Sequence, residues 1–98
     1  MIRVELPFHL QNLAQTTAEV QLAVAPPVTP LSVIRALELK YPALRGAIIE
    51  HNSNKRRPLI RFFACQQDIS HNNMETPLAD AIVNGSEPFI VIGAIAGG

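Results

Sequence analysis

Residues 29–42, TPLSVIRALELKYP, hold the main helical pattern of this 98-residue chain and decide its fold class. Thr29 suits the N-cap of a helix, and Pro30 suits the first helical position, where its missing N–H is not needed. One face then repeats apolar side chains at helical spacing, at Leu31, Ile34, Leu37 and Tyr41. Pro42 ends the pattern. We therefore predict one main helix over residues 31–41.

Alternating apolar and polar residues predict β-strands on both sides of this helix. The predicted strands cover residues 2–6, 20–24, 59–65, 68–69 and 88–94. Short helical segments are predicted at residues 8–17 and 43–50, and a helical turn is predicted to open at residues 76–78. One main helix covers only one face of a mixed four- or five-stranded sheet, so the other face meets solvent. The sequence therefore predicts an α+β roll, with residues 1–98 in a single domain.

The uncovered face of the sheet is predicted to carry apolar side chains. The last strand is apolar on both faces because four apolar residues follow one another, Phe89, Ile90, Val91 and Ile92. Exposed apolar groups of this kind often mark a protein interface. We therefore predict a partner-binding surface formed by Phe63, Ile90, Ile92, Ile95 and Ala96. The alternative is that residues 66–87 fold over this face and bury it.

The composition excludes several classes of function. Eight basic residues balance eight acidic ones, so the chain has no overall field to attract nucleic acid or an anionic membrane. The basic cluster Lys55-Arg56-Arg57 is interpreted as a solvated loop. No apolar stretch approaches the length of a membrane span. Cys65 is the single cysteine, which excludes an internal disulfide and favours a reducing compartment, so we expect a cytoplasmic protein.

The last six residues, 93–98, carry no charged or hydrogen-bonding side chain. We predict that they form a flexible tail, which presents the α-carboxylate of Gly98 to a partner. Gly97 and Gly98 leave the backbone thin enough to enter a narrow channel. The sequence therefore makes Gly98, with Gly97 before it, the candidate reactive site. The alternative is a loose chain end without a role.

No catalytic or metal-binding motif accompanies this tail. The three histidines, Cys65 and Asp68 show no recognised ligand spacing, so no metal site is predicted. No histidine lies at a motif position that would activate Cys65 as a nucleophile. We therefore expect a carrier or binding module on which other enzymes act.

Three groups of residues resemble the ubiquitin-like MoaD/ThiS sulfur carriers. The first is the helix that begins at Thr29 and ends at Tyr41-Pro42, followed by Leu44. The second is the strand at residues 59–63, with Asp68-Ile69 and Thr76-Pro77-Leu78 after it. The third is the last strand running into Ala96-Gly97-Gly98. The order and spacing of these groups cover nearly the whole chain. The chain departs from the family at Cys65-Gln66-Gln67, where an Asn-Gly turn is common.

The resemblance implies a β-grasp fold, in which the first and last strands pair in parallel at the sheet centre. It also implies that an ATP-dependent, ubiquitin-activating-like (E1-like) adenylyltransferase couples AMP to Gly98, and that sulfur then replaces one oxygen to give a thiocarboxylate. The chain itself would bind no cofactor, since the activating enzyme uses the ATP. A larger synthase subunit is a further implied partner, because the length and the Tyr41-Pro42 helix end favour the molybdopterin branch over the thiamin branch.

Two other functions stay open at this point. The chain is alternatively a ubiquitin-like modifier, conjugated to lysines through Gly98, or a β-grasp interaction module with an inert tail. A thiocarboxylate on Gly98 is the signature of a sulfur carrier, whereas isopeptide-linked adducts of higher mass are the signature of a modifier.

Overall fold

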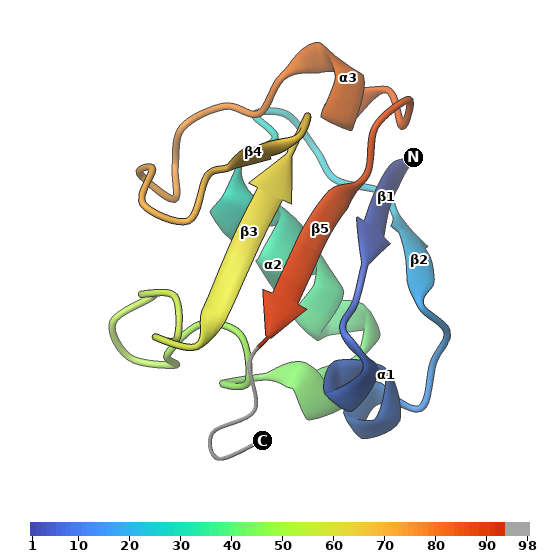
Figure 1. Ribbon diagram of the computed structural model, residues 1–98, viewed down its shortest axis with the longest axis vertical. Helices are drawn as coiled ribbons and strands as arrows, with labels where there is room; N and C mark the ends of the chain where they lie inside the picture. The colour runs from blue at the N-terminus through green and yellow to red at the C-terminus, as the bar shows by residue number, and fades with distance from the viewer. Residues whose placement is uncertain (94–98) are drawn as a thin grey trace.

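A five-stranded sheet lies across one long helix in the computed structural model, which describes residues 1–93 (Figure 1). In chain order the elements are β1 (Ile2–Glu5), α1 (Phe8–Ala14), β2 (Glu19–Leu22), α2 (Pro30–Lys40), the 3₁₀ helix η1 (Pro42–Leu44), β3 (Ile60–Ala64), β4 (Gln67–Asp68), α3 (Asp80–Val83) and β5 (Phe89–Gly93). The predicted α+β roll is confirmed, with α2 behind the sheet and α1 at the end toward which β5 points.

The last strand lies in the middle of the sheet. The strand order is β2-β1-β5-β3-β4, and β5 pairs in parallel with β1 and antiparallel with β3. The register places Val4 opposite Phe89 and Phe62 opposite Val91. Because β1 and β5 are parallel, the connection between them must cross the sheet, and α2 makes that crossing. The mixed sheet and its central parallel pair agree with the sequence-based prediction.

Helix α2 begins where the sequence predicts. The Ser32 backbone N–H donates to the Thr29 hydroxyl at 3.1 Å, and the Thr29 N–H donates to the Ser32 hydroxyl at 2.8 Å. This reciprocal capping box satisfies two backbone donors at the helix start. Of the predicted face, Ile34 and Leu37 are fully buried, and Leu31 and Tyr41 are partly buried and pack against the core. Val33, which was not predicted, is fully buried as well.

The core lies between α2 and the inner face of the sheet. Alternate residues of β3 and β5 point into it, and the Phe62 and Phe89 rings pack with their centroids 5.2 Å apart. Val4 and Val91 lie beside them and are almost completely buried. The predicted inward face of β3, Ile60, Phe62 and Ala64, is therefore confirmed.

Two predicted helical segments differ from the structure. Residues 43–50 do not form a helix after η1, because Gly46 takes a φ of +79° and the chain turns there. Ile48 and Ile49 then enter the core as extended backbone, and Ile49 bridges to Arg56. The turn predicted at residues 76–78 forms later as α3, because the Leu78 N–H donates to the Val28 carbonyl at 2.8 Å and holds that backbone extended.

Candidate functional site

Strand β5 carries the chain to one end of the sheet at Gly93, the last residue that the structure describes. Figure 1 shows that this end lies near α1 and away from the loop that carries α3. Of the predicted site residues, Ile95, Ala96, Gly97 and Gly98 lie outside the described part of the chain. The fold therefore fixes the place from which the predicted reactive segment departs.

The other predicted partner residues come together on the open face of the sheet. Phe63 lies opposite Ile90 in the β3–β5 ladder, and Ile92 lies two residues further along β5. Phe63 and Ile90 are partly buried, and Ile92 is 45% exposed. In Figure 1 no described segment lies in front of β3 and β5, so residues 66–87 do not cover this face. We call Phe63, Ile90 and Ile92 the apolar strip.

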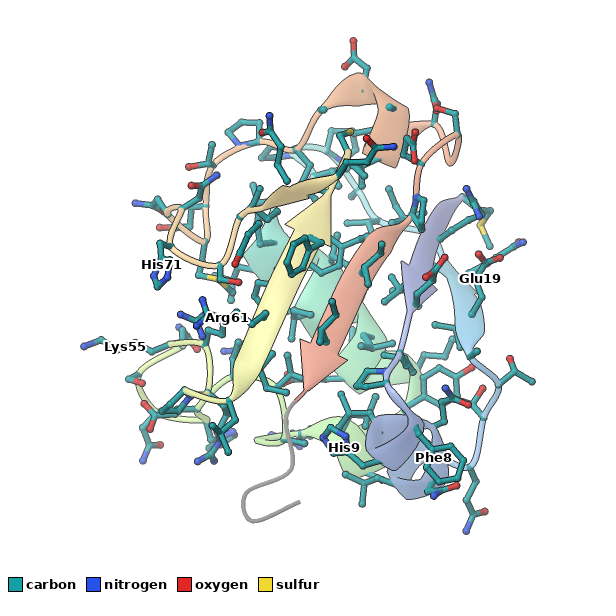
Figure 2. All side chains as sticks on the ribbon, in the orientation of Figure 1. Phe8, His9, Glu19, Lys55, Arg61 and His71 are labelled. Atoms are coloured by element: carbon teal, nitrogen blue, oxygen red, sulfur yellow. The ribbon has the colours of Figure 1, made fainter. Side chains whose placement is uncertain are left out.

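Charged side chains frame the apolar strip on both sides. Arg61 lies opposite Ile92, forms an ion pair with Asp68 at 3.6 Å and lies 3.3 Å from the His71 ring (Figure 2). Across β5, Glu5 lies opposite Ile90, with the Arg3–Glu19 ion pair beyond it on the same sheet. An apolar centre with a charged rim has the composition of a protein interface.

Asp68 is held ionised at this rim. The Ser70 side chain and the Ser70 backbone N–H, which donates to Asp68 Oδ1 at 2.9 Å, hold the pKa of the Asp68 carboxyl below its ordinary value of 3.8. The charges of Arg61 and His71 act in the same direction. The carboxylate therefore keeps its charge, and its ion pair with Arg61, through the whole neutral range.

The basic loop interpreted as solvated is partly built into the fold. The Arg56 guanidinium donates to the carbonyls of Ser70 and Ile60, which ties the loop to both ends of the β3–β4 region. The Arg57 Nε donates to the Gly46 carbonyl at 2.7 Å. These contacts give the two arginines a structural role that composition alone did not indicate.

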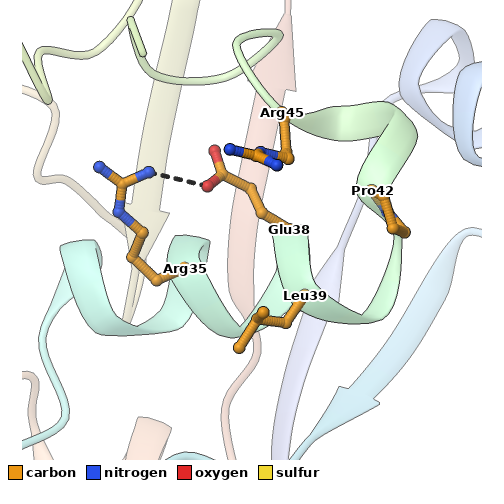
Figure 3. A pocket seen from close by; sticks show the side chains of 5 residues that line it. All are labelled: Arg35, Glu38, Leu39, Pro42 and Arg45. Atoms are coloured by element: carbon orange, nitrogen blue, oxygen red, sulfur yellow. Dashed lines mark hydrogen bonds and ion pairs between the residues drawn. The ribbon is translucent and has the colours of Figure 1, made fainter. Parts of the chain in front are cut away.

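A hollow of about 390 Å³ lies on the helix side of the molecule (Figure 3). Its lining combines Leu39, which is 84% exposed, with Pro42 and three charged residues, Arg35, Glu38 and Arg45. Glu38 is almost completely buried and forms an ion pair with Arg35 at 2.9 Å. In Figure 3 the Arg45 guanidinium lies on the other side of the same carboxylate. Glu38 and Arg35 are thus engaged with each other, and the lining of the hollow contains no nucleophile with a neighbouring base.

Residues 1–93 contain no group of three or more His, Cys, Asp or Glu side chains that could hold a metal ion. They also contain no helix that is long and apolar enough to cross a membrane.

Comparison with known proteins identifies the fold. Neither a protein-family model nor a curated protein matches the sequence. Among solved structures, a chain of the Amycolatopsis orientalis BexX/CysO complex matches with a TM-score of 0.77 and 18% identity over 100% of both chains. SAMP1 of Haloferax volcanii matches with a TM-score of 0.75 and 17% identity, over 98% of this chain and 97% of that one. The small archaeal modifier protein 1 of Methanosarcina acetivorans matches with a TM-score of 0.71 and 25% identity, over 98% and 94%.

The chain has the β-grasp fold. The predicted resemblance to the ubiquitin-like sulfur carriers is confirmed in that its structural neighbours are small proteins of this kind. A β-grasp sheet places the last strand at its centre, and in this chain that strand carries both Ile90 and Ile92 of the apolar strip and the root of the segment that ends at Gly98. The predicted binding and reactive residues, apart from Phe63 of β3, therefore belong to one continuous stretch of chain.

Sequence reasoning missed one residue near this root. His9 of α1 was considered only as a metal ligand, yet its ring lies against the backbone of Gly93. The sequence held one indication of this contact, which is Gly93 itself. A glycine in an apolar strand often marks a place where another group comes close to the backbone.

Proposed function

We propose that this β-grasp protein is a sulfur carrier whose reactive group is the α-carboxylate of Gly98. The observation that carries the proposal is the central strand β5, which leads from the apolar strip to Gly93, five residues before Gly98 in the sequence. Five residues extend at most about 18 Å. A partner that docks on the strip can therefore reach Gly98 with its active site while it holds the folded part of the chain.

The chemistry begins with activation of the carboxylate. A terminal carboxylate has a pKa of about 3.3–3.7 and is an anion and a poor electrophile at neutral pH. Attack of its oxygen on the α-phosphate of ATP forms an acyl adenylate and releases pyrophosphate. A sulfide sulfur then attacks the carbonyl carbon, AMP leaves, and the product is the thiocarboxylate. A persulfide sulfur instead gives an acyl disulfide as AMP leaves, and a second thiol then attacks the donor's sulfur, breaks the S–S bond and releases the thiocarboxylate, while the two thiols end as a disulfide. Gly98 has no side chain to obstruct either attack.

The partner is an ubiquitin-activating-like (E1-like) adenylyltransferase, and we propose that the apolar strip is its docking surface. The strip has the exposed apolar centre and the charged rim that such an interface needs. In this proposal the protein is cytoplasmic, binds no cofactor of its own and is not an enzyme. The thiocarboxylate delivers sulfur through a larger synthase subunit in a reaction of the molybdopterin type.

The docking surface is tested with two matched substitutions. Ile92→Asp places a carboxylate on the most exposed residue of the strip, opposite Arg61, while Leu39→Asp places the same group on an exposed leucine of the helix side. We expect Ile92→Asp to weaken binding of the adenylyltransferase by about tenfold or more, since an apolar interface contact contributes about 1–2 kcal/mol or more. Leu39→Asp should bind as the unmodified protein does. Equal binding by both variants would remove the strip from the interface.

The reactive residue is tested by Gly98→Ala. The added methyl group obstructs the attack on the α-phosphate, and the described core of the protein does not include Gly98. We expect ATP–pyrophosphate exchange to be lost in the presence of the adenylyltransferase, with no change in melting temperature. A Gly98→Ala protein that is adenylated at the normal rate would refute the assignment.

A second function, conjugation through Gly98, is favoured by one observation: two of the neighbouring structures are named as archaeal modifier proteins. It uses the same activated carboxylate, but the acceptor is a lysine amine and the product is an isopeptide. Mass analysis separates the two functions, because a carrier returns as the thiocarboxylate and a modifier appears in adducts of higher mass. An inert interaction module would show neither product.

A further inference from the structure

The last residue of β5 lies against a side chain of α1, which a residue larger than glycine at this position would have to displace. Gly93 follows Phe89 and Val91 on the inner face of the sheet and lies opposite Ile60 in the β3–β5 ladder. A Cβ placed on Gly93 would overlap the Cε1 of the His9 ring, and it would lie 3.1 Å from His9 Nε2 and 3.3 Å from Ile60 Cδ1. The imidazole thus occupies the space that the side chain of residue 93 would take in an ordinary strand.

Helix α1, which carries His9, is anchored in the fold. The neighbouring Leu10 is only 1% exposed and anchors the helix in the core. The Gln11 side chain donates to the Leu6 carbonyl at 2.9 Å, which ties the helix to the end of β1. Figure 2 shows the His9 side chain beside the end of β5, where the described part of the chain stops. The backbone that carries the His9 ring is therefore fixed beside Gly93.

We propose that His9 is a positioning residue, which orders the backbone at Gly93, where the segment ending at Gly98 begins. The proposal rests on the proposed function, because this ordering matters only if the segment must enter a partner. Removal of the ring loosens the backbone at Gly93, and the ordering that His9 provides must then be supplied on binding.

The contact itself is tested by a double-mutant cycle. Gly93→Ala alone forces the His9 ring away, and we expect the melting temperature to fall by about 4 °C or more, as for overpacking in a core. In the His9→Ala background the contact with Ile60 Cδ1 at 3.3 Å remains but the overlap with the ring is gone, so Gly93→Ala should cause a much smaller further fall. Additive effects of the two substitutions would show that the ring does not press on residue 93 and would overturn the proposal.

The positioning role is tested without any partner by ¹⁵N relaxation. We expect the backbone order parameter at Gly93 to fall from about 0.85, typical of rigid backbone, to below about 0.6 in His9→Ala. Phe8→Ala is the matched control, because Phe8 is the neighbouring residue of α1 and its ring is 73% exposed. The control should leave Gly93 rigid. A rigid Gly93 in His9→Ala would overturn the proposal.

Kinetics with the adenylyltransferase give the functional result. We expect His9→Ala to raise the KM for the carrier by about tenfold, with a smaller change in kcat, because the lost ordering is supplied when the segment binds. His9→Phe keeps a flat ring on Gly93 and should restore the KM. An unchanged KM in His9→Ala would overturn the positioning role. If the unmodified protein is not adenylated at all while Gly93 loses order in His9→Ala, the proposed function fails and the structural role of His9 stands.

Discussion

Phe62 and Phe63 are adjacent in β3, and the structure gives them opposite roles. The Phe62 ring is fully buried against Phe89, whereas Phe63 lies on the open face opposite Ile90. Phe62→Ala leaves a cavity that α2 and the sheet cannot close, so we expect a loss of about 3–5 kcal/mol in the free energy of unfolding. Phe63→Ala leaves no cavity, because its site opens to solvent. Phe63→Ala should lower the free energy of unfolding by about 1–2 kcal/mol, because the contact of a half-buried ring is lost.

Denaturant unfolding of both variants, followed by circular dichroism, measures this difference. The expected gap of about 2 kcal/mol is a large part of the 5–15 kcal/mol that stabilise a typical domain. If Phe62→Ala is too unstable to purify, Phe62→Leu compared with Phe63→Leu keeps the test, with the same order of effects. Equal losses in the two variants would refute the assignment of the faces of β3. The same Phe63→Ala protein should bind the adenylyltransferase more weakly, since the strip loses its only aromatic ring.

Three smaller predictions concern local structure. Thr29→Ala removes the capping box that Thr29 forms with Ser32, and thermal unfolding should show a loss of about 1 kcal/mol; an unchanged stability would show that the cap contributes nothing. Gln66 has a φ of +66° in the two-residue turn between β3 and β4. Because glycine adopts this conformation without strain, Gln66→Gly should raise the free energy of unfolding by about 0.5–1 kcal/mol. A lower free energy of unfolding, measured by chemical denaturation, would contradict this. The pKa of Asp68 is lower in the folded chain than in the unfolded chain, where it is near 3.8. The contribution of the Asp68 carboxylate to the free energy of unfolding is therefore present above the unfolded pKa and is lost as the pH falls through the lower folded pKa. Asp68→Asn should therefore reduce the difference in stability between pH 6 and pH 3, and an identical pH profile would count against it.

Much of the fold could be predicted because local and long-range signals agree. The capping residues of α2 and the alternation along β3 each indicate the structure that forms, and the apolar run of β5 fits its central place in the sheet. The helix predicted over residues 43–50 was wrong, because Gly46 takes a positive φ and the chain turns there despite the helical spacing of its neighbours. No pattern in the sequence marks such a turn before its tertiary contacts are known.

The apolar strip could be predicted only in part. Consecutive apolar residues indicate that β5 is apolar on both faces, but whether residues 66–87 cover the outer face depends on where that loop runs. The Leu78–Val28 hydrogen bond holds the loop at the end of the sheet, and a pairing of that kind has no local signal. The contact between His9 and Gly93 was missed because the glycine marks its own position but not its partner, and the two residues are far apart in sequence and meet only in the fold.

The central claim is that Gly98 carries sulfur, and its most direct test is the mass of the protein isolated from its own cells. C-terminal fragments are compared with and without thiol alkylation, because oxidation of Met1 or Met74 changes the mass almost as much as replacing oxygen by sulfur. The account predicts an alkylatable thiocarboxylate on Gly98. A Gly98 that stays a plain carboxylate in the cell, and is not changed by ATP, a sulfur donor and the adenylyltransferase, would contradict it.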